Sequence, residues 1–282
     1  MMKRYSRMSK RKNTLTLIPL ILLIIINLVP FYIMLVGAFK PSMALYNIPA
    51  DISPISNLSL RNIFNVVQKI NMPNAFKNSL LISGGICLIT VFVGMSGGYV
   101  FAKHSFWGKK FWFALLIATM MLPKQILLIP NFIVANELHI VNTRIGVILT
   151  TVNSAYAIFL CKQYMVSLPN DMIEAAILDG CTEYSVFFRI VLPTSKPVIG
   201  ALTIFTFISS WNDFVWQNIM LTSKKVQTVP LALAYLDGQT DIMTTLGNKM
   251  AGATLSAIPM VLIFICFQRF FIKGIAVGGL KE

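Results

Sequence analysis

The sequence is poor in the residues that most enzymes and soluble domains use. Charged residues make up 12% of the 282 residues and hydrophobic residues 56%, whereas soluble domains have roughly 25% charged and 45–50% apolar residues. The two histidines, His104 and His139, lie in different loops, so no helical pair of histidine ligands for zinc or haem can form. No His, Cys or Ser constellation supports an enzyme acting on lipid. These absences disfavour catalytic and metal-dependent functions.

The sequence also lacks paired cysteines and a phosphate-binding loop. The four cysteines are scattered and form no Cys-x-x-Cys pair: Cys87, Cys161, Cys181 and Cys266. We interpret them as apolar packing residues and assign them neither a disulfide nor a metal. A Gly-x-x-x-x-Gly-Lys-Ser/Thr phosphate loop is also missing, so the chain cannot cradle a nucleotide in that manner. Any ATP-driven work would need another subunit.

Long apolar runs dominate the chain. A membrane helix needs about 20 predominantly apolar residues, and six stretches approach or exceed this length: Leu15–Phe39, Leu80–Ala102, Phe111–Ala135, Ile145–Cys161, Val198–Leu221 and Ala251–Ile272. We therefore predict an all-α, polytopic membrane protein. Its parts are a basic N-terminus (1–14), a six-span transmembrane domain (15–273) and a tail (274–282) whose three glycines should not continue a stable helix.

The net charge of +14 would point to nucleic acid in a soluble protein, but here its distribution follows the spans. Basic residues gather before the first span, between the second and third, and around the end of the sixth: Lys3, Arg4, Arg7, Lys10, Arg11, Lys12, Lys103, Lys109, Lys110, Arg269, Lys273 and Lys281. By the positive-inside rule both termini and the loop at Glu174 are cytoplasmic. Lys224 and Lys225, on an outer connection, count mildly against this orientation.

Two outer connections are long. The first runs from Lys40 to Lys77, and apolar side chains at helical spacing predict a short surface helix over Ser59–Ile70 within it. The second, Thr222–Met250, mixes charged residues with proline and glycine. Such a composition suits a loop that contacts a partner, and a passive loop fits it nearly as well.

The most informative segment is a polar loop within residues 167–197. Ser167 and Pro169 suit the start of a short helix that ends at Gly180. Thr182 is placed to cap a second short helix, which Pro193 should stop. We expect two buried faces, one on each helix, formed by Ile173, Ala176 and Ile177 and by Tyr184, Phe187, Phe188 and Val191. The segment therefore predicts a helix, a glycine turn and a helix along the membrane surface.

The anchor positions of this loop are Glu174, Ala175, Ala176, Gly180, Ile190, Leu192 and Pro193. At each of them the sequence resembles the signature loop of the membrane subunits of bacterial ATP-binding-cassette importers. An ordinary amphipathic helix pair at the interface is the structural alternative. The resemblance implies that the loop couples the permease to an ATPase through Glu174, Ala175, Ala176, Asp179, Gly180, Ile190, Leu192 and Pro193.

The resemblance covers nearly the whole chain. Within the family, the sequence resembles in particular the carbohydrate, maltose-permease-like branch. This resemblance rests on Phe39–Pro41, Asn78–Leu80, Thr119–Pro123 with Gln125 and Leu128–Pro130, Asn142-Thr143, Trp211–Phe214, Gln268–Gly274 and Gly278–Lys281. Lys124 departs from the pattern, where a small or uncharged residue is expected. This departure puts the depth of that position or the usual substrate preference in doubt.

What the resemblance implies is a sugar importer of the bacterial plasma membrane that works by alternating access. Its expected partners are a second homologous permease subunit, two ATPase subunits that bind ATP and magnesium, and an extracytoplasmic solute-binding protein. The chain itself would hold no cofactor and would not be an enzyme. The tail residues Gly278, Gly279, Leu280 and Lys281 would contact the ATPase subunits.

Polar groups at membrane depth are costly unless paired or wetted, so they are candidates for the translocation path. Sugar hydroxyls and ring faces favour amides and carboxylates beside aromatic rings. The candidates are Lys124, Gln125, Asn153, Tyr156, Asn212 and Asp213. Hydrogen bonds between helices are the bland alternative for each. Trp211 precedes two of them, and because successive helical residues turn by about 100°, we expect it to be a packing residue.

Two rival functions remain open at this point. An ion-gradient-driven secondary transporter also needs broken helices and intramembrane charges, and Lys124 with Asp213 would be its coupling pair. Pro123 and Pro130 should interrupt the third span and free backbone carbonyls for neighbouring groups or a wet cavity, and a simple packing kink is the alternative interpretation. An importer of another solute, such as glycerol phosphate, is also compatible with the sequence.

Overall fold

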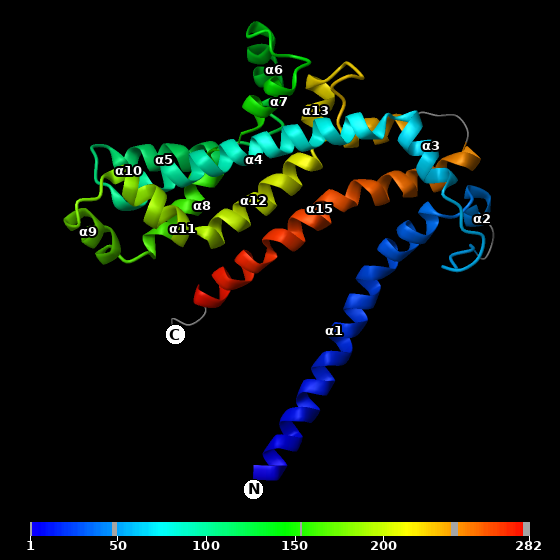
Figure 1. Ribbon diagram of the computed structural model, residues 1–282, viewed down its shortest axis with the longest axis horizontal. Helices are drawn as coiled ribbons and strands as arrows, with labels where there is room; N and C mark the ends of the chain where they lie inside the picture. Colours follow the sequence, from blue (N-terminus) through cyan, green and yellow to red (C-terminus); the bar gives the residue numbers. More distant parts are fainter. Residues whose placement is uncertain (1, 47–49, 153, 238–241, 279–282) are drawn as a thin grey trace. The chain divides into compact units, whose positions relative to one another are not determined.

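The computed structural model describes residues 2–46, 50–152, 154–237 and 242–278 (Figure 1). These residues form helices joined by loops, as predicted for an all-α protein. The chain divides into two compact units. The first comprises Met1–Met72 and Leu233–Ser256, and the second comprises Pro73–Ala232 and Ala257–Glu282.

The first unit contains α1 (Met2–Ala38), α2 (Ser42–Tyr46) and α3 (Arg61–Lys69), with the end of α14 (Val229–Asp237) and the start of α15 (Ile242–Gly278). Helix α3 confirms the helix predicted in the first outer connection. A small core holds these elements together: Ala38, Val66, Leu236 and Ala251. The buried Asn62 side chain donates from Nδ2 to the carbonyl oxygens of Lys40 (2.6 Å) and Ala38 (3.2 Å). Helix α3 is thereby fixed to the end of α1.

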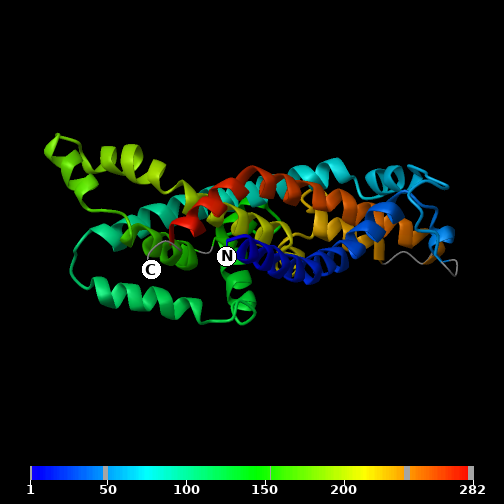
Figure 2. The ribbon, with the colours of Figure 1, turned by 90° about the horizontal axis from the view of Figure 1, so that it is seen from below.

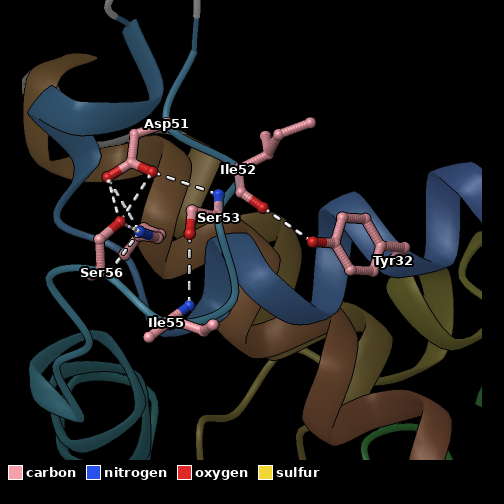
Figure 3. Close-up of polar contacts among 7 residues, drawn as sticks. Tyr32, Asp51, Ile52, Ser53, Ile55 and Ser56 are labelled. Carbon is pink, nitrogen blue, oxygen red and sulfur yellow. Dashed lines mark hydrogen bonds and ion pairs between the residues drawn. The ribbon is translucent and has the colours of Figure 1, made fainter.

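A buried lysine organises the loop after α1. Lys40 is fully buried, and its Nζ lies 2.9 Å from Asp51 Oδ2 and 2.9 Å from Ser56 Oγ, with a further bond to the Ser56 carbonyl. Figure 3 shows the Asp51 carboxylate between Ser53 and Ser56, and Tyr32 donating to the Ile52 carbonyl. Because Lys40 donates to Asp51, the pKa of this carboxyl is lowered from its ordinary value.

The second unit is built around α4 (Met72–Lys103), which begins at the boundary residue. Its other helices before the loop at Glu174 are α5 (Lys109–Met120), α6 (Leu128–Glu137), α7 (Arg144–Thr151) and α8 (Ser154–Val166). After that loop come α12 (Lys196–Trp211) and α13 (Val215–Met220), and the second half of α15 closes the unit. Figures 1 and 2 both place the loop at one end of the unit, away from α6 and α13.

Small residues let α4 pack tightly on α8. A Cβ added at Gly94 would lie 2.7 Å from Ala157 Cβ, and one at Gly98 would lie 2.9 Å from the Lys162 backbone nitrogen. Real Cβ atoms do not approach so closely, so these positions require glycine. Gly94 and Gly98 therefore form the contact between α4 and α8.

The predicted spans are only partly continuous helices. Three helices of the described chain are long and apolar enough to cross a membrane: Leu17–Ala38, Met72–Lys103 and Leu246–Gln268. Two bent pairs, Arg144–Thr151 with Ser154–Val166 and Glu183–Thr194 with Lys196–Trp211, would raise the number to five. The expected third span, Phe111–Ala135, is instead split into α5 and α6. Pro123 lies in the break as predicted, whereas Pro130 lies in the first turn of α6, where proline is tolerated.

Helix α15 contradicts one expectation about the end of the chain. It continues through Gly274 to Gly278, although the glycines were expected to end it. Gly274 is followed by apolar residues, and a single interior glycine costs a helix only about 1 kcal/mol. The predicted tail residues Gly279, Leu280 and Lys281 lie outside the described residues.

Candidate functional site: the coupling loop and an intramembrane cavity

The first helix of the loop is α9 (Asp171–Leu178), which ends at a glycine turn. Gly180 has φ +84°, in the left-handed region that favours glycine. The Cys181 N–H donates to the Ala176 carbonyl (2.9 Å) and the Gly180 N–H to the Ile177 carbonyl (3.0 Å). This pair of bonds is a Schellman motif, which satisfies carbonyls at the end of a helix. The predicted glycine stop at Gly180 is confirmed.

The second helix begins at Thr182, whose side chain accepts from the Ser185 N–H (3.3 Å) as predicted. It runs through α10 (Glu183–Val186), a π-helix (Phe187–Val191) and α11 (Leu192–Thr194). Pro193 does not stop it, because this residue is at the start of α11, where its missing N–H costs little. The chain turns by 73° only after Thr194. The prediction that Pro193 ends the helix is therefore wrong.

The buried faces of the two helices differ partly from the predicted ones. Ile173 and Ala176 are buried, whereas Ile177 is exposed. On the second helix Val186, Phe187 and Val191 are buried, and the two aromatic residues Tyr184 and Phe188 are exposed. The π-helical turn contains more residues than an α-turn, so it changes which side chains face inward. A calculation with α-helical spacing alone cannot anticipate this shift.

The face that points away from the core is partly apolar. Leu178 is 88% exposed and Tyr184 80% exposed, and Ile177, Phe188 and Met172 are also exposed. We call these five residues the exposed coupling face. Glu174, Ala175, Asp179 and Gly180 are exposed beside it, while Ala176 is buried and Ile190 and Leu192 are partly buried against the core. Large exposed apolar side chains clustered in this way are typical of protein interaction sites.

The end of α4 fastens this loop. Lys103 Nζ donates to the Leu168 carbonyl (2.5 Å) and to Asn170 Oδ1 (2.8 Å) immediately before α9. On the second helix, Glu183 Oε2 accepts from the Tyr99 hydroxyl (3.2 Å) and lies 3.6 Å from His104 Nε2. Both coupling helices are thus tied to one transmembrane helix. The sequence interpretation treated Lys103 only as a topology marker and His104 only as a missing metal ligand, so it missed this role.

A cavity of about 270 Å³ lies within the second unit. Its walls come from α4, α7, α8, α12 and the break between α5 and α6: Ile86, Thr90, Lys124, Thr151, Tyr156, Phe205, Thr206, Ser209 and Ser210. Of the predicted path residues, Lys124 and Tyr156 line it. The hydroxyl-bearing residues were missed, because serine and threonine in helices usually bond their own backbone.

Three other predicted path residues, Gln125, Asn212 and Asp213, are not among those lining the cavity. Gln125 is exposed in the break after α5, and Asn153 lies outside the described residues. Asn212 donates to the Ile208 carbonyl (2.9 Å), and Asp213 Oδ1 accepts from the Trp216 N–H (3.2 Å) at the start of α13. Both bonds join residues three or four positions apart in the chain, so they are local and differ from the hydrogen bonds between helices that the sequence analysis named as the alternative.

Trp211 behaves as expected of a packing residue. It is 1% exposed and stacks on Phe207, with ring centroids 5.4 Å apart and an interplanar angle of 18°. The edge of Phe76 lies against it, with centroids 5.8 Å apart. Its ring is therefore used within the protein core.

Comparison with known proteins identifies the family. The protein family described as "Binding-protein-dependent transport system inner membrane component" matches residues 90–277 of the chain. The chain belongs to this family. The permease is 33% identical, over the full length of both chains, to an arabinooligosaccharides transport system permease protein of Bacillus subtilis (strain 168). It is 29% identical to an sn-glycerol-3-phosphate transport system permease protein of Escherichia coli (strain K12), with 91% of this permease and 93% of the relative covered.

A solved structure shows the same fold. A bacterial ABC transporter involved in the import of the acidic polysaccharide alginate superposes with a TM-score of 0.81 at 18% identity, covering 92% of the permease and 97% of that chain. The predicted family, fold class and membrane location are thus confirmed. The permease is a transport subunit of an ATP-binding-cassette importer and is not in itself an enzyme. The ion-gradient alternative is not favoured.

Proposed function

We propose that this permease carries a sugar or oligosaccharide across the bacterial plasma membrane, receiving it from an extracytoplasmic binding protein. A second homologous permease completes the path, and two ATPase subunits bind ATP with magnesium and supply the energy. The exposed coupling face carries this proposal. An ATPase subunit that buries this face gains the free energy of removing Leu178, Ile177 and the neighbouring aromatic rings from water.

The contacts of Lys103 and Glu183 explain how docking would be used. Movement of an ATPase subunit against α9 is passed to α4 through the bonds at Leu168 and Asn170, and through the second helix at Glu183. Gly278, the last residue of α15, and the following Gly279, Leu280 and Lys281 would make a second contact with the ATPase pair. The permease thus converts closure of its partners into movement of membrane helices.

The docking proposal is tested by replacing an exposed leucine with a charged residue. Leu178→Asp should release the ATPase subunits from a permease complex purified in nanodiscs and abolish ATP-dependent uptake. Leu138→Asp is the matched control, because Leu138 is 62% exposed and lies outside the coupling loop. If Leu178→Asp retains its ATPase subunits as well as the control does, the exposed coupling face is not the docking surface.

The proposed orientation places both termini and the coupling loop in the cytoplasm. A cysteine at Ile55, which is 87% exposed in the first outer connection, should react with a membrane-impermeant thiol reagent in intact cells. A cysteine at Ser6 should react only after the cells are opened, with the native cysteines removed from both variants. Labelling of Ser6→Cys from outside would reverse the orientation.

A further inference from the structure

The cavity in the second unit has an unusual lining for membrane depth. Thr90 is buried, with 1% exposure, and its hydroxyl has no hydrogen-bond partner among the described residues. The buried hydroxyl of Thr151, the last residue of α7, also has none. A buried hydroxyl without a partner costs about 1–3 kcal/mol, and threonine in a helix normally avoids this cost by bonding its own backbone. Two hydroxyls in one cavity are therefore available to form hydrogen bonds with a molecule that enters it.

Charge in the cavity has one sign. Lys124 is a cation in the break after α5, and the lining residues include no carboxylate. Asp213 acts electrostatically on Lys124 but is not a lining residue, and its Oδ1 is bonded to the Trp216 N–H. The other polar groups of the lining are hydroxyls from Thr206, Ser209, Ser210 and Tyr156. A cation among hydroxyls, beside the exposed ring of Phe205, suits a ligand with several hydroxyl groups and a negative charge.

We propose that this cavity is a solute subsite within the permease, and that it takes a polyhydroxylated solute bearing an anionic group that pairs with Lys124. The anionic group is a carboxylate or a phosphate, which present similar oxygen acceptors to an ammonium. The inference rests on the proposed transport function and specifies its substrate class. It also explains why a lysine occupies a position where the family resemblance predicts a small or uncharged residue.

The charge of the cavity can be measured without knowing the solute. The assembled importer in nanodiscs, without native cysteines, carries Ser209→Cys in the cavity or Ser167→Cys in the exposed loop before α9 as a control. Each is labelled with a negatively charged sulfonatoethyl thiosulfonate and a positively charged trimethylammonium analogue. The measured quantity is the ratio of the labelling rate of the negative reagent to that of the positive reagent. We expect this ratio to be about tenfold higher at Ser209→Cys than at the control position, as in clefts lined by one sign of charge.

The lysine variants separate charge from structure. Lys124→Met should return the ratio of labelling rates to that of Ser167→Cys, whereas Lys124→Arg should preserve it. An unchanged ratio in Lys124→Met would show that another group sets the charge and would overturn the assignment. Failure of both reagents to reach Ser209→Cys would show that the cavity is filled in the assembly, which also overturns it.

Protection from labelling identifies the anionic group. Glucuronate, glucose 6-phosphate and glucose are added to the Ser209→Cys importer at equal concentration. We expect slower labelling with one or both anionic sugars. Protection by glucuronate alone indicates a carboxylate, protection by glucose 6-phosphate alone indicates a phosphate, and protection by both indicates that the subsite accepts either group. Equal protection by glucose, or protection by none, overturns the proposal. Retention of the ATPase subunits is recorded on the same samples, so loss of docking is distinguished from failure of the subsite.

Discussion

Replacement of Gly180 tests the geometry of the coupling loop most directly. Its φ of +84° lies in the left-handed region, and a Cβ added there would meet nothing within 4 Å. A side chain at this position therefore costs backbone strain and no steric clash. The left-handed conformation costs an L-residue roughly 1–2 kcal/mol, and a β-branched residue is a genuine outlier there. Asparagine is among the residues that adopt it routinely.

The strain lowers the population of the loop conformation that is proposed to dock on the ATPase subunits. A cost of roughly 1–2 kcal/mol corresponds to about a 5–30-fold change in an equilibrium, and apparent affinity falls by the fraction of molecules lost from the competent state. We expect Gly180→Val to raise the Kd for the ATPase subunits about 5–30-fold. Gly180→Asn should stay close to the wild-type value.

The measurement is titration of the permease complex in nanodiscs with labelled ATPase subunits, alongside uptake by the reconstituted importer. The permease should remain folded and inserted in both variants, because Gly180 is at an exposed turn. Equal affinities for Gly180→Val and Gly180→Asn would refute the strain argument. Wild-type affinity and uptake in both would remove the turn from the coupling mechanism.

Three further predictions follow from particular contacts. Lys103→Met removes two bonds from a charged donor, each worth about 1.5–3 kcal/mol, so ATP hydrolysis should persist while uptake per ATP falls; normal stoichiometry would contradict the tie to α4. Gly98→Val overpacks α4 against α8 at a cost of about 1–3 kcal/mol and should lower the thermal transition of the purified permease, whereas Gly84→Val, where a Cβ meets nothing within 4 Å, should lower it less. The folded pKa of Asp51 is lowered by Lys40, so this carboxylate stabilises the outer loop above its unfolded pKa of about 3.9, and the contribution is lost as pH falls through the folded pKa. Hydrogen exchange near Ile55 should therefore be flat from pH 7 to about 5 after correction for intrinsic rates and should accelerate in more acidic solution, and Asp51→Asn should abolish this acid step.

Local chemistry explains which parts of the fold could be read from the sequence. The stop at Gly180 and the cap at Thr182 depend on residues a few positions apart, so they were predicted correctly. The exposed Phe188 lies in a π-helical turn, for which no residue type is diagnostic. Helix α15 continued past Gly274 because propensity is a weak prior beside the context of a long helix.

A residue of the candidate site could be predicted where its type is rare in a membrane helix. It was missed where its type is common and only its hydrogen bonding in three dimensions is unusual. Lys124 was singled out because a lysine at membrane depth is rare. Thr90 and Thr151 are ordinary residues for a membrane helix, and their missing hydrogen bonds appear only in three dimensions. The tie from Lys103 to Asn170 joins residues far apart in the chain, so no spacing rule could have found it.

The length of α4 has a mechanical consequence for transport. Its 32 residues span about 48 Å at 1.5 Å per residue. Near one end, Asn78 donates to the Lys225 and Gln227 carbonyls (3.0 and 2.8 Å), while Lys103 holds the coupling loop at the other. Since the glycine contact leaves no slack between α4 and α8, the two helices must travel as one rod. In the proposed mechanism a push on the loop at α9 is therefore carried along α4 to the connection at Lys225, and the chain can bend at the breaks at 121–127 and after Thr194.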